Sequence, residues 1–311
     1  MIIWKRLWKM IALSISVLAL SVLAGCGGGS GGTGSSSSNS SASVSNTIIN
    51  GLASKGPIAN GTVSIYAISN GQMGNVLAST TTGSNGSFMA NLGAYNGAMM
   101  VQVTGGSYID EATNKTVQMG SMMLRTAVSN AAGNVTVAVT PITEMAVQYM
   151  GTLTSQDMID LSNNMMGSKF GISDIVHTLP QNVTGSNSAA NNSSQTYYGL
   201  MLAAMSQAAA SNNISMSTLM STIANSLKDT SSTGSQTLTS MMSLMSQSFI
   251  NFQNSTNNKT GVTTMSPGGI MSTLGGMMGN STGNSTGASN NATGTTGSMM
   301  GNSAGNSAMG R

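Results

Sequence analysis

The spacing of apolar residues changes at Pro141, and this change constrains the fold more than any other feature of the chain. Before Pro141, short runs such as residues 62–68 alternate polar and apolar side chains, the spacing of half-buried strands. After Pro141, apolar residues recur every three or four positions, as in residues 216–227, the spacing of one helix face. The sequence therefore predicts strands followed by helices, which is the α+β class.

Turn signals divide the first region, residues 47–140, into short strands. Asn-Gly pairs at Asn60-Gly61, Asn70-Gly71 and Asn96-Gly97 are typical of tight hairpin turns, in which both central residues take a positive φ. About seven short strands in a region of this length indicate an antiparallel β-sandwich.

Two motifs in this region resemble a known family. The run from Gly56 to Tyr66, Gly-Pro-Ile-Ala-Asn-Gly-Thr-Val-Ser-Ile-Tyr, resembles the opening of carboxypeptidase-regulatory-like (transthyretin-like) domains. The run from Thr80 to Phe88 resembles their next hairpin, although the usual acidic residue is replaced by Gly83 or Ser84. The resemblance implies an Ig/transthyretin-like sandwich, a fold used mostly as a non-catalytic spacer or interaction module.

The resemblance extends over residues 47–230. Residues 103–113 and 139–144 resemble a group of bacterial lipoproteins to which no activity is assigned. The spacing in residues 141–253 predicts a small all-α domain of about four to six helices, starting with Thr140 as cap and Pro141 at the first helical position. Residues 254–311 are rich in Gly, Asn, Ser and Thr, which predicts a disordered low-complexity tail.

The N-terminus has the pattern of an export signal. Lys5, Arg6 and Lys9 precede an apolar segment, residues 10–23, that is too short to span a bilayer of about 30 Å. The segment ends in Leu-Ala-Gly followed by Cys26, the single cysteine of the chain. This resembles the bacterial lipoprotein signal, and the resemblance implies that residues 1–25 are removed and that Cys26 is lipidated.

Removal of the signal changes the charge of the chain. It leaves seven basic and seven acidic side chains, because three of the 10 basic residues lie in the signal. A nucleic-acid partner is therefore not expected.

The sequence after the signal indicates how the protein is attached. Residues 26–46 form a Gly/Ser-rich tether to a lipid anchor. Gly27 stands where lipoproteins retained in the inner membrane usually have Asp, so the resemblance implies the outer membrane, in a periplasmic or surface-facing position.

The inventory of chemically active residues is short. One Cys and one His exclude an intrachain disulfide and a Cys/His zinc site. His177 lies three residues after Asp174, which fits either a general base paired with a carboxylate or a histidine at a helix end. Asp110 and Glu111 would point to opposite faces of a strand, unlike the converging carboxylates of a glycosidase. We therefore expect no catalytic, cofactor-binding or metal-binding residues.

The chain has 28 methionines, and they leave two interpretations open. Thioethers select Cu(I) and Ag(I), so the methionines could bind a soft metal; alternatively, they replace leucine in the core. The adjacent pairs are Met99-Met100, Met122-Met123, Met277-Met278 and Met299-Met300.

The sequence predicts a non-catalytic outer-membrane lipoprotein that displays a structural or interaction module to an unknown envelope or surface protein. The alternatives are an extracytoplasmic Cu(I)/Ag(I) binder and a surface adhesin or carbohydrate-binding protein, although both Trp residues lie in the signal. With only seven carboxylates, we also expect the fold to tolerate acid.

Overall fold

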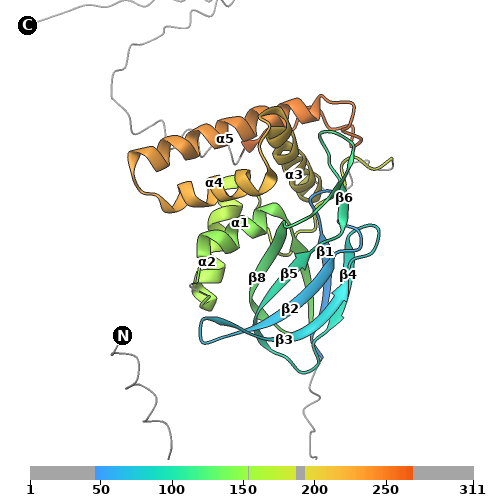
Figure 1. Cartoon of the computed structure of the whole chain (residues 1–311), viewed down its shortest axis with the longest axis vertical. Helices are drawn as coiled ribbons and strands as arrows, with labels where there is room; N and C mark the ends of the chain where they lie inside the picture. Colours follow the sequence, from blue (N-terminus) through green and yellow to red (C-terminus); the bar gives the residue numbers. More distant parts are fainter. Residues whose placement is uncertain (1–45, 153, 187–192, 269–311) are drawn as a thin grey trace, which may run out of the picture. The chain divides into compact units, whose positions relative to one another are not determined.

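The computed structural model describes residues 46–152, 154–186 and 193–268, in which strands come first and helices follow (Figure 1). The α+β class is therefore confirmed. The predicted signal, Cys26, nearly all of the tether and the tail from residue 269 lie outside the described residues, and so do the methionine pairs at 277–278 and 299–300.

The strands form two larger sheets and a hairpin. One sheet has the order β4-β1-β9, the other has the order β3-β2-β5-β8, and β6 pairs with β7. The strands are β1 (Ile48–Ala53), β2 (Thr62–Ser69), β3 (Gln72–Thr81), β4 (Ser87–Asn91), β5 (Gly97–Thr104), β6 (Ser107–Ile109), β7 (Thr116–Gln118), β8 (Met123–Ala131) and β9 (Asn134–Val139).

Pairing is antiparallel except between β1 and β9, which run parallel. The local sequence pattern does not predict this pair. The physical reason is that β1 and β9 are the first and last strands, so no tight turn connects them and fixes their directions as opposite.

The hairpin between β2 and β3 shows how the sequence sets the local structure. Asn70 and Gly71 have φ values of 51° and 72°, and Ser69 pairs with Gln72 across them. Two consecutive positive φ values are those of a type I′ turn, so the Asn-Gly prediction is confirmed here.

Five helices follow the strands within the described residues: α1 (Pro141–Met150), α2 (Gln156–Phe170), α3 (Ser193–Ser211), α4 (Met216–Lys228) and α5 (Ser232–Gln253). The hydroxyl of Thr140 accepts a hydrogen bond from the Thr143 amide, and Pro141 takes the first helical position. The predicted start of α1 is therefore confirmed.

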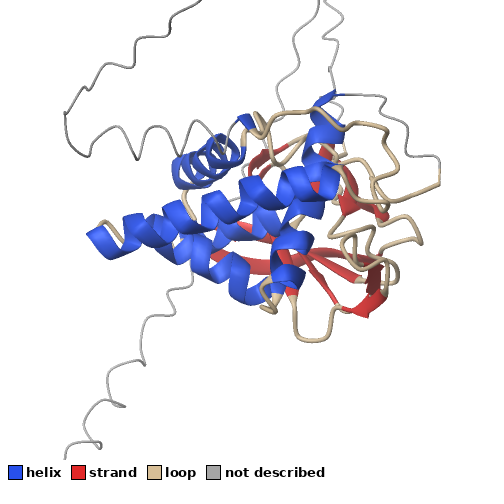
Figure 2. Ribbon diagram, turned by 90° about the horizontal axis from the view of Figure 1, so that it is seen from above, coloured by secondary structure: helices blue, strands red, loops and turns tan. Residues whose placement is uncertain are grey.

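Helices and sheets share their apolar cores. One cluster combines inward residues of both larger sheets, such as Ile49 and Val101, with helix residues such as Phe249. A second cluster lies on the other face of the four-stranded sheet, where Met100 of β5 packs with Ile159 of α2. Figure 2 shows the helices lying over one side of the strands. Strand β5 is consequently buried on both faces over part of its length.

Residues 254–268, which the sequence analysis assigned to the tail, lie against the fold. The Asn257 side chain donates hydrogen bonds to the carbonyls of Glu111 and Ala112 at 3.1 and 2.8 Å. Val262 and Met265 pack against the main core. This segment therefore contributes to the surroundings of the β6–β7 hairpin.

Among the helices of the described residues, none combines the length and the hydropathy that a membrane crossing requires.

Candidate functional site

A buried lysine lies between two carboxylates at the junction of strands and helices. Lys55 follows β1, and its side chain is 1% exposed. Its Nζ lies 2.8 Å from Asp110 Oδ2 and 3.1 Å from Glu111 Oε2. We call Lys55, Asp110, Glu111 and Ser206 the Lys55 cluster.

The two carboxylates converge, which corrects the expectation that Asp110 and Glu111 point to opposite faces. They lie in the turn after β6 rather than within a strand. Asp110 Oδ1 accepts hydrogen bonds from the amide and hydroxyl of Thr113, at 3.0 and 2.9 Å. This turn directs both side chains to one ammonium group.

Ser206 of α3 joins the helices to the cluster. Its Oγ lies 2.5 Å from both Lys55 Nζ and Glu111 Oε2. The Tyr108 ring covers Lys55 on another side, with its centroid 4.8 Å from Nζ, a cation–π distance. Residues from three separate parts of the chain therefore surround one positive charge.

Sequence reasoning missed Lys55 and Ser206. The signal that could have found Lys55 is that residues 56–109 contain no charged side chain. Lys55 precedes this uncharged stretch, and the acidic pair Asp110-Glu111 follows it. Opposite charges at the two ends of such a stretch are natural partners in a core. Ser206 gave no comparable signal in so serine-rich a chain.

The electrostatics of the cluster keep Lys55 and Asp110 ionised. Burial opposes the charge on Lys55, but Glu111 and Asp110 outweigh it, so the Lys55 pKa is raised. Burial also opposes the charge on Asp110, but Lys55 and the Thr113 hydrogen bonds leave the Asp110 pKa lowered. A protonated lysine cannot accept a proton from Ser206, so the resting arrangement does not fit Ser/Lys hydrolysis.

A cavity of about 270 Å³ opens beside the cluster. Asp110 is the member nearest to solvent, with 15% of its side chain exposed. The lining combines a few polar groups with an apolar wall, namely Lys55, Tyr108, Asp110, Thr113, Val117, Ser206, Ala209, Ala210, Asn213, Ile214 and Met216.

The predicted contact between His177 and Asp174 is confirmed, and it lies at the surface. His177 Nδ1 is 2.9 Å from Asp174 Oδ2, and about half of each side chain is exposed. The hydrogen bond that His177 donates to Asp174, together with the charges of Asp174 and Asp160, raises the His177 pKa. Burial acts against the charge of Asp174, but the His177 contacts leave the Asp174 pKa lowered. The pair is thus a solvated ion pair over part of the physiological pH range.

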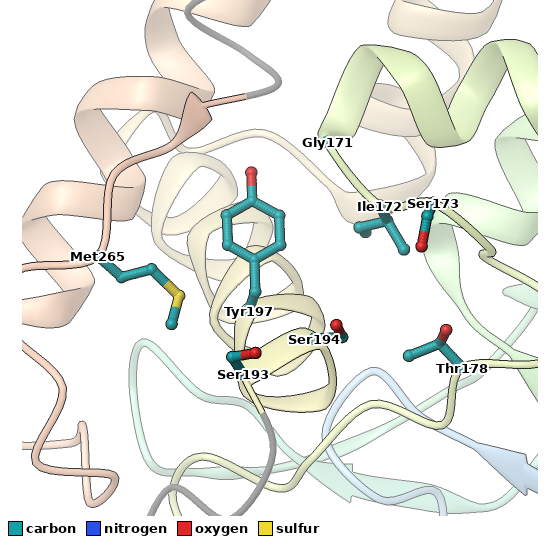
Figure 3. A pocket seen from close by; sticks show the side chains of 8 residues that line it. All are labelled: Gly171, Ile172, Ser173, Thr178, Ser193, Ser194, Tyr197 and Met265. Atoms are coloured by element: carbon teal, nitrogen blue, oxygen red, sulfur yellow. The ribbon is translucent and has the colours of Figure 1, made fainter.

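A third site is lined by hydroxyl groups and lies between the end of α2 and the start of α3. The cavity measures about 290 Å³, and Figure 3 shows the Tyr197 ring standing between Met265 and Ile172. Tyr197 donates a hydrogen bond to the Phe170 carbonyl at 2.9 Å. The residues lining this cavity carry no charge, and they are Gly171, Ile172, Ser173, Thr178, Ser193, Ser194, Tyr197 and Met265.

In the described part of the chain, no three His, Cys, Asp or Glu side chains are placed to hold an ion. The hypothesis of a soft-metal site concerns methionine thioethers instead. Met99 packs in the main core and Met100 in the second cluster, on opposite faces of β5, so the two sulfurs diverge.

No protein-family model and no curated protein matches the chain.

Proposed function

We propose that the chain is a non-catalytic lipoprotein of the outer membrane that displays a transthyretin-like β-sandwich and its helices as a structural or interaction module. The observation that carries the proposal is the position of the single cysteine, Cys26, directly after Leu-Ala-Gly at the end of an apolar segment. A lipid on this cysteine anchors a protein to a membrane without a spanning helix.

The sandwich part of the proposal is supported by the core. Both larger sheets contribute side chains to one cluster, for example Ile49 of β1 and Val63 of β2. The non-catalytic part is supported by the Lys55 cluster, whose charged groups bind one another. Because these charged groups are paired with one another, few of them are left to contact a substrate.

Metabolic labelling with a clickable palmitate analogue tests the anchor. We expect the wild-type chain to be labelled and to sediment with outer membranes, and Cys26→Ser to do neither. Labelling of Cys26→Ser at the wild-type level, or an unlabelled wild-type chain in the soluble fraction, would contradict the proposal.

Protease treatment of intact cells then distinguishes the two faces of the membrane. Peptides from the loop between β2 and β3 released from intact cells indicate surface display to an external partner. Protection of that loop until the envelope is opened indicates a periplasmic partner. The Asn70-Gly71 turn is a suitable reporter because it connects two exposed strand ends.

A further inference from the structure

The Lys55 cluster holds an amine and a carboxylate in direct contact, and the chemistry open to that pair goes beyond an ion pair. Lys55 Nζ lies 2.8 Å from Asp110 Oδ2, and Glu111 Oε2 lies 3.1 Å from the same nitrogen. We propose that Lys55 and Asp110 condense to an intramolecular isopeptide bond, with Glu111 carrying the protons between them. The inference does not depend on the membrane anchor.

The step balances without any further reactant. Glu111 first accepts a proton from the Lys55 ammonium, and the lone pair of the neutral amine then attacks Cγ of Asp110. A bond forms between Nζ and Cγ, and the bond between Cγ and one carboxylate oxygen breaks, its electron pair leaving with the oxygen. Two of the ammonium protons pass to that oxygen, one of them delivered by Glu111, and it departs as water. The products are an amide, one water molecule and an ionised Glu111.

The geometry favours condensation in two ways. Holding the amine against the carboxylate raises their effective concentration far above that of free groups in water. Exclusion of water disfavours the reverse hydrolysis, and Lys55 and Glu111 have side chains that are only 1% and 4% exposed. Water formed in the step can leave through the adjoining cavity, because Lys55 and Asp110 both line it.

The second carboxylate also supports the proposal. One carboxylate would neutralise Lys55, and each additional buried charge carries a desolvation cost. Before condensation the cluster holds the charges of Lys55, Asp110 and Glu111, whereas afterwards only Glu111 is charged. Ser206 Oγ lies 2.5 Å from Glu111 Oε2 and can donate a hydrogen bond to the charge that remains. Glu111 thus has a function as proton carrier that a simple ion pair would not require.

The bond would form slowly. The raised pKa of Lys55 makes the neutral amine a minor species, and the lowered pKa of Asp110 makes its neutral carboxyl, the better electrophile, a minor species as well. The step needs to occur only once in the lifetime of each molecule, so a low rate is sufficient. The measurement must therefore follow the protein over time.

Mass spectrometry of the purified full chain tests the proposal. We expect a loss of about 18 Da, the mass of one water, that accumulates after folding. Digestion with trypsin and chymotrypsin cuts the chain at Tyr66 and Phe88, between the two residues. We expect a branched peptide that joins Lys55 to Asp110, which separates the isopeptide from dehydration of a single aspartate.

Three variants make the test specific. In Asp110→Asn the condensation would release ammonia, so the loss should change to about 17 Da. Lys55→Met should show no loss, and Glu111→Gln should form the bond much more slowly while keeping the other two residues. A wild-type chain that retains its full mass after prolonged incubation in the folded state would overturn the proposal. So would a loss of mass without the branched peptide.

Discussion

At the scale of single residues, Lys55 is the side chain whose environment most limits what can replace it. An isolated ammonium in a core is very unfavourable, and here two carboxylates, a hydroxyl and an aromatic ring compensate for burial. Removal of the cation would leave Asp110 and Glu111 facing each other without a counter-charge. The consequence of a substitution at Lys55 is therefore electrostatic more than steric.

The first prediction concerns Lys55→Met, which keeps much of the side-chain volume. We expect a decrease of about 3–5 kcal/mol in the free energy of unfolding, because two buried carboxylates lose their partner. Urea denaturation measures the change. Lys259→Met is the matched control, because Lys259 is exposed and should cost little. If Lys55→Met unfolds at the wild-type urea concentration, the cluster does not stabilise the fold.

At the scale of elements, the start of α1 connects three parts of the chain. Thr140 Oγ1 accepts from the Thr143 amide and lies 2.7 Å from the Tyr198 hydroxyl, which donates to the Ile175 carbonyl. Thr140 is fully buried. One hydroxyl thus caps α1 and connects it to α3 and to the loop after α2.

The second prediction is that Thr140→Ala lowers the free energy of unfolding by about 2 kcal/mol, since it removes a cap and a buried hydrogen-bond partner. Thr140→Ser, which keeps the hydroxyl, should recover most of the loss. Ser155→Ala removes only the exposed cap of α2 and should cost less than Thr140→Ala. The midpoint of chemical denaturation at an unchanged slope measures each effect. Equal losses for Thr140→Ala and Ser155→Ala would contradict the connecting role.

The third prediction concerns the close approach of α3 to the loop before it. A Cβ on Gly199 would lie 2.1 Å from the Gln181 carbonyl oxygen and 2.8 Å from Val183 Cγ1. Gly to Ala within a helix normally stabilises by about 1 kcal/mol. Here we expect the opposite sign, a loss of about 1–3 kcal/mol, because backbone must shift.

Thermal denaturation measures the Gly199→Ala effect. Ser240→Ala on the exposed face of α5 is the control for helix propensity alone, and it should be neutral or stabilising. A higher melting temperature for Gly199→Ala would show that the loop can shift without a loss of folding stability.

The same elements show what the sequence could and could not predict. The apolar stripe on α4, which includes Leu219 and Ile223, is buried as predicted, because helical periodicity is a local property. Helix α5 begins at Ser232, and Ser231 is its cap, although several other serines and threonines lie nearby. A serine-rich sequence offers several equivalent caps, and only packing selects among them. The convergence of Asp110 and Glu111 on Lys55 depends on a turn and on tertiary contacts, so it was not predictable from local pattern.

At the scale of the whole molecule, ionisation affects stability in opposite directions at the two ends of the pH range. Asp174, and Asp110 before any condensation with Lys55, have lowered pKa values in the fold, so their stabilising effect is present above the ordinary value of 3.8 and is lost as pH falls through the folded pKa. His177 has a raised pKa, so its contribution is complete below 6.5 and is lost as pH rises through the folded pKa. The chain should be most stable between these values.

The fourth prediction is a small decrease in the urea midpoint between about pH 5.5 and about pH 8, which His177→Asn abolishes. The decrease is small because the ion pair is half exposed and therefore screened by solvent. Asp174→Asn should abolish it as well. A pH dependence that persists unchanged in both variants would assign the effect to other groups.

Strand β1 is bonded on both sides, to β4 in antiparallel and to β9 in parallel orientation. A pull on the chain ahead of Ile48, directed along β1, would load both hydrogen-bond ladders in shear, so many bonds would have to break together. An edge strand pulled across its ladder would instead unzip one bond at a time. If the proposed lipid on Cys26 holds the chain at a membrane, the central position of β1 makes the sheet resist mechanical extraction.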